Sequence, residues 1–392
     1  MPVLEVTQLQ LDGRKVLVRC DFNVPLHEGR IADPARIDAS LDTIRYILGH
    51  DGSAVLCSHL GRPKERTPEL SLKPVAEYLS VALGQKIALA PDCIGEVTLG
   101  LVAALKPGGA LLLENLRFHR EEEANDRDFS HELARGKDLY INDAFGSAHR
   151  AHSSTVGVTR FLAERAAGFL MKRELKALSA LIHDPARPYV AILGGAKVSD
   201  KIGVIRNLMT KVDAILIGGA MAYTFLRASG VGVGRSRVEA DKLLLAGELM
   251  TEAARRGVPL LLPIDHVVAV SPEAGTAETV ETIPPDLMAL DIGPRTAEEY
   301  IARLQGTRTV VWNGPLGYFE VPAFARGTLK VGEALANLEG VFSVIGGGDT
   351  AAALSKQPWS NRFSHISTGG GATLEYLEGI ELPGVKALET RS

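Results

Sequence analysis

Short runs of β-branched and other apolar residues recur along the whole chain, and each is followed by a turn and then a helical pattern. In the first half these runs are Val16–Val24, Ala54–His59, Lys86–Ala90, Ala110–Leu116 and Leu139–Asp143. In the second half they are Tyr189–Leu193, Ala214–Ile217, Leu260–Ile264, Thr309–Trp312, Val341–Ile345 and His365–Ser367. Apolar runs separated by helix-length intervals are typical of a parallel sheet covered by helices on both faces. The two series therefore predict an α/β protein with two doubly wound, Rossmann-like domains.

A helical pattern separates the two series. Residues at helical spacing from Leu170 to Leu181 lie between Gly168 and Asp184, and they predict a connecting helix. A length of 392 residues also suits two domains. We expect a deep cleft between the domains and an extended tail at Leu382–Val385. The expected divisions are a first domain at 1–168, the interdomain helix at 169–183, a second domain at 184–372, and a C-terminal segment at 373–392 that packs back towards the first domain.

Composition excludes several classes of function. The formal net charge is −4, with 43 basic and 47 acidic residues, whereas nucleic-acid binding needs a clear basic excess. No apolar run approaches the roughly 20 residues of a membrane span, and the first residues do not form a signal peptide. The three cysteines have no CxxC spacing. These features predict a cytoplasmic, reducing location, with neither nucleic acid nor membrane as a partner.

Polar and cationic residues follow the strands of the first half. Ligands of open parallel sheets bind beyond the carboxyl ends of the strands, so these residues are candidates for a binding site. Each alone has an ordinary explanation, such as a turn-forming Asp or Asn or a surface arginine in a salt bridge. Together they favour a site for a highly charged anion. The residues are Asp21, Asn23, Arg36, His59, Arg62, Arg117, His149, Arg150 and His152.

Glycine-rich turns follow the strands of the second half. Lys197 and Lys201 lie four residues apart behind the Gly194-Gly195 turn, where a helix start offers free N–H groups to phosphate. A solvated cation pair is the structural alternative. The segment lacks GxxxxGK[ST], so it is not a Walker A loop. Glu320 follows a later strand and is either a ribose ligand or simply an acid favoured at a helix start.

The triple glycine Gly346–Gly348, followed by Asp349, allows two interpretations. Its backbone donors could hold phosphates, with Asp349 binding Mg²⁺ between them. Gly346, Gly348 and Ala351 also fit the GxGxxA pattern of a dinucleotide-binding dehydrogenase. That pattern expects an acid at the end of the next strand, whereas the segment Ser367–Gly371 has none. The metal–nucleotide interpretation is therefore favoured.

The motifs in combination resemble the phosphoglycerate kinase family. They occur in the family's order along nearly the whole chain, at Arg19–Pro25, Ser58–Pro63, Glu114–Phe118, Asn142–Ser154, Gly194–Lys201, Trp312–Glu320 and Gly346–Thr350. The resemblance implies reversible phosphoryl transfer between 1,3-bisphosphoglycerate and MgADP, giving 3-phosphoglycerate and MgATP. It also implies Mg²⁺ as cofactor, small-molecule partners only, and a monomer.

The resemblance further implies residue roles. The 3-phosphoglycerate site would comprise Asp21, Asn23, Arg36, His59, Arg62, Arg117 and Arg150. The nucleotide site would comprise Lys197, Lys201, Gly293, Glu320, Gly346, Gly347, Gly348, Asp349 and Thr350, with Asp349 as the metal ligand.

Transfer to a carboxylate needs no general base, because this nucleophile is ionised near neutral pH. We expect Arg36, Lys197 and amides around Gly370 to stabilise the transferring group, and the domains to close around both substrates. Phe169–Leu181 and Gly369–Gly371 are the hinge candidates. Two alternatives remain. The first is a dehydrogenase, but this sequence lacks the acid that would bind ribose. The second is a non-catalytic nucleotide-binding protein, which would be expected to have lost some cations of the anion site, whereas all of them are present here.

Overall fold

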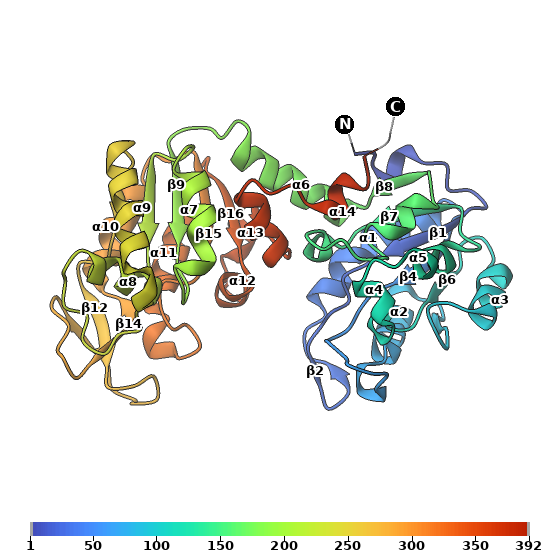
Figure 1. Ribbon diagram of the computed structural model, residues 1–392, viewed down its shortest axis with the longest axis horizontal. Helices are drawn as coiled ribbons and strands as arrows, with labels where there is room; N and C mark the ends of the chain where they lie inside the picture. Colours follow the sequence, from blue (N-terminus) through green and yellow to red (C-terminus); the bar gives the residue numbers. More distant parts are fainter. Residues whose placement is uncertain (1–2, 390–392) are drawn as a thin grey trace. The chain divides into compact units, whose positions relative to one another are not determined.

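The computed structural model describes residues 3–389 (Figure 1). The chain forms two compact units. Unit 1 comprises the chain up to Lys176 together with the segment from Glu381 onward, and unit 2 comprises Ala177–Ile380. The division between Lys176 and Ala177 lies within α6 (Phe169–Ile182). Among the described residues, no helix has the length and apolar character needed to cross a membrane.

Unit 1 is built on a six-stranded parallel sheet with the order β5-β6-β4-β1-β7-β8. The strands β4 and β7 are buried at every position, so the sheet is covered on both faces. The strands are β1 (Lys15–Arg19), β4 (Ser53–Cys57), β5 (Ala88–Leu89), β6 (Ala110–Leu112), β7 (Leu139–Asn142) and β8 (Arg165–Ala167), with a separate hairpin of β2 (Leu26–His27) and β3 (Arg30–Ile31).

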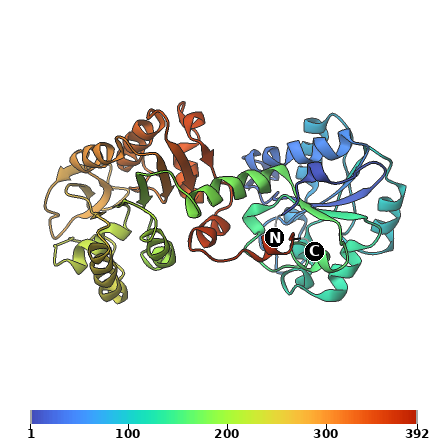
Figure 2. The same ribbon diagram turned by 90° about the horizontal axis from the view of Figure 1, so that it is seen from above.

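The helices of unit 1 cover this sheet, and Val16, Leu56 and Ile44 are among the side chains in the core between them. The helices are α1 (Ala35–Gly49), α2 (Lys73–Leu83), α3 (Glu96–Ala104), α4 (Arg120–Glu123), α5 (Arg127–Ala134) and α14 (Pro383–Lys386). The last segment of the chain closes the unit (Figure 2). Val3 pairs with Glu389 in an antiparallel bridge, and the N–H of Gly384 donates to the carbonyl of Ala148 at 2.8 Å.

Unit 2 has a second six-stranded parallel sheet, with the order β11-β10-β9-β15-β16-β17. Its core includes Trp312, Tyr300 and Ile192. The strands are β9 (Tyr189–Leu193), β10 (Ala214–Ile217), β11 (Leu260–Leu261), β15 (Thr309–Asn313), β16 (Phe342–Gly346) and β17 (His365–Ile366). The helices are α7 (Ile202–Leu208), α8 (Met221–Ala228), α9 (Leu243–Arg255), α10 (Pro294–Leu304), α11 (Arg326–Ala336), α12 (Gly348–Leu354) and α13 (Gly371–Leu377).

A small antiparallel sheet completes unit 2. It consists of β12 (His266–Ala269), β13 (Glu278–Val280) and β14 (Met288–Ile292) in the order β13-β12-β14. It packs on α8 through Tyr223 and Val268, and Figure 1 shows it beside that helix.

The predicted fold class is confirmed, two local expectations are wrong, and one small sheet was not predicted. The first strand ends at Arg19 rather than Val24, because the chain turns so that the N–H of Phe22 donates to Ser58 Oγ. The small sheet was not predicted, since its strands are short and partly exposed. The expected extended tail at Leu382–Val385 mostly forms α14, with Pro383 at its first position.

Candidate active site

The anion-site candidates of unit 1 follow four adjacent strands of one parallel sheet. Asp21 and Asn23 follow β1, His59 and Arg62 follow β4, Arg117 follows β6, and Arg150 follows β7. These strands are neighbours in the order β6-β4-β1-β7. The carboxyl ends of parallel strands meet at the same edge, so the sheet gathers these side chains at one edge.

Hydrogen bonds connect the loops at this edge. Asn23 Oδ1 accepts from the N–H of Gly61 at 2.9 Å, and Arg117 Nη1 donates to the carbonyl of Gly61 at 2.6 Å. Arg36 joins from the start of α1, where its Nη1 lies 3.3 Å from both Asp21 Oδ2 and the carbonyl of Asn23. The loops after β1, β4 and β6 therefore form one connected surface.

The edge has an excess of cations around a buried imidazole. Burial and the nearby charges of Arg19 and Arg117 hold the pKa of His59 well below its ordinary value. The same causes lower the pKa of His152 to about 4. Burial also lowers the pKa of Arg117, with further contributions from Arg150 and Arg62. Cations held close together stabilise a bound anion, so this edge suits a ligand of high negative charge.

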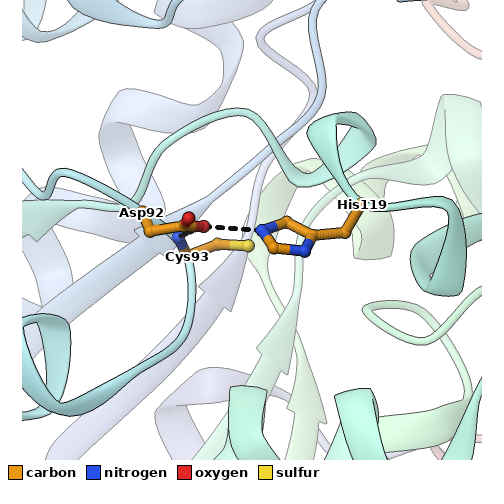
Figure 3. Close-up of side chains that lie close together, drawn as sticks. All are labelled: Asp92, Cys93 and His119. Carbon is orange, nitrogen blue, oxygen red and sulfur yellow. Dashed lines mark hydrogen bonds and ion pairs between the residues drawn. The ribbon is translucent and has the colours of Figure 1, made fainter. Parts of the chain in front are cut away.

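A cluster of Asp92, Cys93 and His119 lies next to the turn that bears Arg117 (Figure 3). Their ligand atoms lie within 4.8 Å of one another, which is compatible with a metal ion. However, Asp92 Oδ1 already accepts from His119 Nε2 at 2.7 Å and from the N–H of Cys93 at 2.6 Å, and Asp92 Oδ2 lies 3.2 Å from Arg66 Nη1.

The pKa values at this cluster agree with an ion pair. The hydrogen bond that His119 donates to Asp92 raises the pKa of His119. Burial raises the pKa of Asp92, but the bonds from His119 and the Cys93 N–H outweigh it and lower the value to about 2. We therefore interpret the cluster as an ion-pair network that anchors the turn after Arg117.

Unit 2 contains a cavity of about 310 Å³ at the ends of β9, β15 and β16. Seven of the predicted site residues line it, and they are Lys197, Lys201, Gly347, Gly348, Asp349, Thr350 and Gly370. Backbone N–H groups at glycine turns and two lysines suit phosphate oxygens. Asp349 is exposed, so its carboxylate can offer the hard oxygen ligand that Mg²⁺ prefers.

Two loops cross at the floor of this cavity. The N–H of Gly194 donates to the carbonyl of Asn313 at 3.0 Å, and the N–H of Gly195 donates to that of Pro315 at 2.9 Å. A Cβ atom on Gly314 would lie 2.1 Å from the carbonyl oxygen of Gly194, and Gly314 has a φ of +99°. Only glycine allows the two backbones to come this close.

Lys201 is buried beside this crossing, and its Nζ donates to Asn313 Oδ1. Burial lowers the pKa of Lys201 to about 8, although Asp200 and Asp349 act in the opposite direction. Asn313 Nδ2 is buried and has no hydrogen-bond partner among residues 3–389. A buried ammonium and an unused amide donor at one cavity are a strong arrangement for an anionic ligand.

The sequence matches the family model for phosphoglycerate kinase over residues 6–380. The chain belongs to the phosphoglycerate kinase family.

Individual relatives agree. The chain is 53% identical to the phosphoglycerate kinase of Moorella thermoacetica over 392 residues and 52% identical to that of Koribacter versatilis over 403 residues, with at least 99% of each chain covered. The phosphoglycerate kinase structure from Coxiella burnetii superimposes with a TM-score of 0.89 at 39% identity, covering 99% of both chains. The chain is accordingly a glycolytic phosphotransferase that acts between 1,3-bisphosphoglycerate and ADP.

Three predicted nucleotide residues of the kinase do not line the cavity. Gly346 ends β16 directly behind it. Glu320 is exposed in the loop after β15. Gly293 lines a second cavity of about 410 Å³, beside α10 and α11. A Cβ on Gly293 would lie 2.2 Å from the Asp265 carboxyl carbon, so packing alone requires glycine there.

Two residues that the structure places at these sites were not predicted from the sequence. Asn313 lines the cavity and contacts Lys201, and its position at the end of a strand was an available signal. Arg19 is 1% exposed and lies against His59. Its position inside an apolar strand was the only signal, since a buried arginine needs partners.

Proposed function

We propose that unit 1 binds 3-phosphoglycerate through the cationic edge and that unit 2 binds the nucleotide in the glycine-lined cavity. The observation that supports this most strongly is the cavity itself, which brings Lys197, Lys201 and Asp349 to the ends of three adjacent strands. In the cationic edge, Asp21, Asn23 and His59 would bind polar oxygens. The guanidinium groups of Arg36, Arg62, Arg117 and Arg150 would bind carboxylate and phosphate oxygens.

The carboxylate of 3-phosphoglycerate is ionised at neutral pH, so the site needs no general base. Catalysis then depends on alignment and on neutralising charge. Arg36 of unit 1 and Lys197 of unit 2, with the amides around Gly370, would stabilise the equatorial oxygens of the transferring group. Lys201 would bind the nucleotide phosphates. Asp349 would hold Mg²⁺, which when bound neutralises negative charge on those phosphates.

The two sets of residues belong to different units, so transfer requires the units to bring their ligands together. We propose that they do so by bending about α6 and the Gly369–Gly371 turn, which also excludes water from the reacting groups. Small-angle scattering should show a smaller radius of gyration with both substrates than with either alone. Equal radii in all states would contradict closure.

We further propose that the 1–168 and 184–372 regions act as the two substrate domains of a cytoplasmic monomer. Light scattering coupled to gel filtration should give the mass of one chain, 41.9 kDa.

The assay that tests the whole proposal supplies 3-phosphoglycerate and MgATP and couples acyl-phosphate formation to an NADH-consuming dehydrogenase. NADH should disappear only when 3-phosphoglycerate, ATP and Mg²⁺ are all present. Oxidation of NADH without the coupling enzyme would instead support the dehydrogenase alternative. The absence of any turnover by the folded chain would support a non-catalytic nucleotide-binding protein.

A further inference from the structure

A buried chain of hydrogen bonds lies behind His59. Arg19 is 1% exposed, and its Nη2 lies 3.1 Å from His59 Nδ1. Its Nε donates to Ser154 Oγ at 2.8 Å, and its Nη1 donates to the carbonyl of Cys20. Three nitrogens of one guanidinium are thus used to fix its plane against the imidazole.

Glu122 is at the other end of this chain. It is 1% exposed and accepts from Ser154 Oγ at 2.5 Å and from the N–H of Ser154 at 3.0 Å. Burial raises the pKa of Glu122, whereas the charge of Arg19 and the two bonds from Ser154 act to lower it. His152 Nδ1 lies 3.9 Å from the carboxylate, but the lowered pKa of His152 leaves that ring neutral. The hydroxyl of Ser154 therefore connects a buried cation to a buried anion.

The direction of each bond follows from chemistry. A guanidinium only donates, so Ser154 Oγ accepts from Arg19 and directs its own proton to Glu122. For the same reason His59 Nδ1 must accept from Arg19. A neutral His59 then carries its proton on Nε2, which leaves that N–H to donate to a ligand.

We propose that Glu122 and Ser154 are positioning residues for substrate binding, because they hold Arg19 and through it fix His59 as the Nε2–H tautomer that donates to 3-phosphoglycerate. This inference rests on the proposed role of His59 at the phosphoglycerate site. It assigns no contact between Glu122 or Ser154 and the substrate.

The test compares Ser154→Ala with Ser153→Ala. Ser153 is equally buried, but its hydroxyl donates to the carbonyls of Glu121 and Asp126 and takes no part in the chain. Loss of a hydrogen bond to a charged group predicts a rise of about tenfold in the KM for 3-phosphoglycerate in Ser154→Ala. The KM for MgATP should stay within about twofold, and Ser153→Ala should change neither. Equal increases in both KM values, or the same change in both variants, would reduce Ser154 to a structural residue.

Long-range ¹H–¹⁵N spectra of the histidine rings provide a second measurement without substrate. The unmodified chain should show His59 protonated at Nε2 and unprotonated at Nδ1, and a proton on Nδ1 would overturn the proposal by itself.

Glu122→Gln, which removes the charge at nearly constant volume, should add a population with Nδ1 protonated and raise the KM for 3-phosphoglycerate. If the tautomer remained fixed in that variant, Glu122 would have no positioning role. If the unmodified chain did not use 3-phosphoglycerate at all, the proposed function would fail, whereas the spectra would still report on the tautomer.

Discussion

Arg36 Nη1 lies 3.3 Å from Asp21 Oδ2, so the arginine that we place at the transferring phosphoryl group already has an anionic neighbour. The side chain of Asp21 is 8% exposed and that of Arg36 is 39% exposed. The buried carboxylate thus orients a guanidinium that still reaches solvent. A side chain held in this way can bind substrate oxygens with little further loss of conformational freedom.

Replacing Arg36 with alanine should therefore abolish most catalysis and leave the fold intact. Arginines that neutralise charge in phosphoryl transfer contribute about a thousandfold or more to kcat, and we expect a loss of that size. Because Asp21 is buried and would lose one hydrogen bond, the substitution should cost about 1–3 kcal/mol of stability, which a folded domain of this size can tolerate. Steady-state kinetics and thermal unfolding measure the two effects. Arg45→Ala, on the same helix, is the control, and a loss of only a few-fold in Arg36→Ala would remove Arg36 from this role.

Lys201→Met should stabilise unit 2 and eliminate nucleotide binding. The pKa of about 8 shows that burial disfavours the ammonium, and the structure gives Lys201 no ion pair among residues 3–389. Removing that charge at pH 7 should raise the melting temperature by about 2–4 °C, which corresponds to about 1 kcal/mol in a domain of this size.

The stability gain of Lys201→Met depends on pH because the pKa of Lys201 is lowered. The cost of burying the charge is complete below pH 8 and disappears as the pH approaches the ordinary value of 10.5. The advantage of Lys201→Met should therefore shrink between pH 8 and pH 10. Calorimetry at both pH values measures it, with the exposed Lys356→Met as control. A variant less stable than the parent at pH 7 would show that the bond to Asn313 outweighs the burial cost.

Gly314→Ala should destabilise unit 2 far more than Gly230→Ala does. Both glycines have positive φ, +99° and +85°, but a Cβ at Gly230 meets no atom within 4 Å. The control substitution should cost about 1 kcal/mol through backbone strain alone. At Gly314 the added collision with Gly194 should bring the total to about 3 kcal/mol or more and weaken ADP binding. Urea unfolding measures both, and equal costs would mean that the loops separate easily.

His119→Gln should reduce stability most between about pH 4 and 6.5. The raised pKa of His119 means that its ion pair with Asp92 contributes fully below the ordinary value of 6.5 and is lost as the pH rises through the raised value. On the acid side, the contribution is lost as the pH falls from the ordinary 3.8 of Asp92 towards 2.

The side chains are partly exposed, so we expect a difference of less than about 1 kcal/mol at pH 5.5 and close to none at pH 9. Urea unfolding at these two pH values, with the exposed His27→Gln as control, measures it. A pH-independent difference would mean that the ring acts only through packing.

Strand periodicity was enough to predict both parallel sheets, and with them the gathering of Asp21, His59 and Arg117 at one edge. It could not place the small sheet of unit 2, because β13 is largely exposed and has no apolar run to indicate it. Arg19 was quoted only as part of a motif. Its contacts with His59 and Ser154 join residues 40 and 135 positions away, which no local pattern records.

The glycines assigned to the nucleotide site have different surroundings in the structure. The turns at Gly194 and Gly347 line the cavity of unit 2, as expected for close approach to a ligand. Gly293 was assigned to the nucleotide site by the resemblance alone, and the structure places it against the carboxyl group of Asp265. A glycine in the sequence indicates that the position has room for no side chain, but it does not indicate whether a ligand or another protein atom occupies the space.

Because Val3 pairs with Glu389, unit 1 can be completed only after the end of the chain has been synthesised. A ribosome releases unit 2 as one uninterrupted stretch, from Ala177 to Ile380, whereas unit 1 waits for the segment from Glu381 onward. Unit 1 therefore begins to emerge first but is completed last. During translation, Ala148 and Arg165 remain without their contacts to Gly384 and Glu389 until the whole of unit 2 has been made.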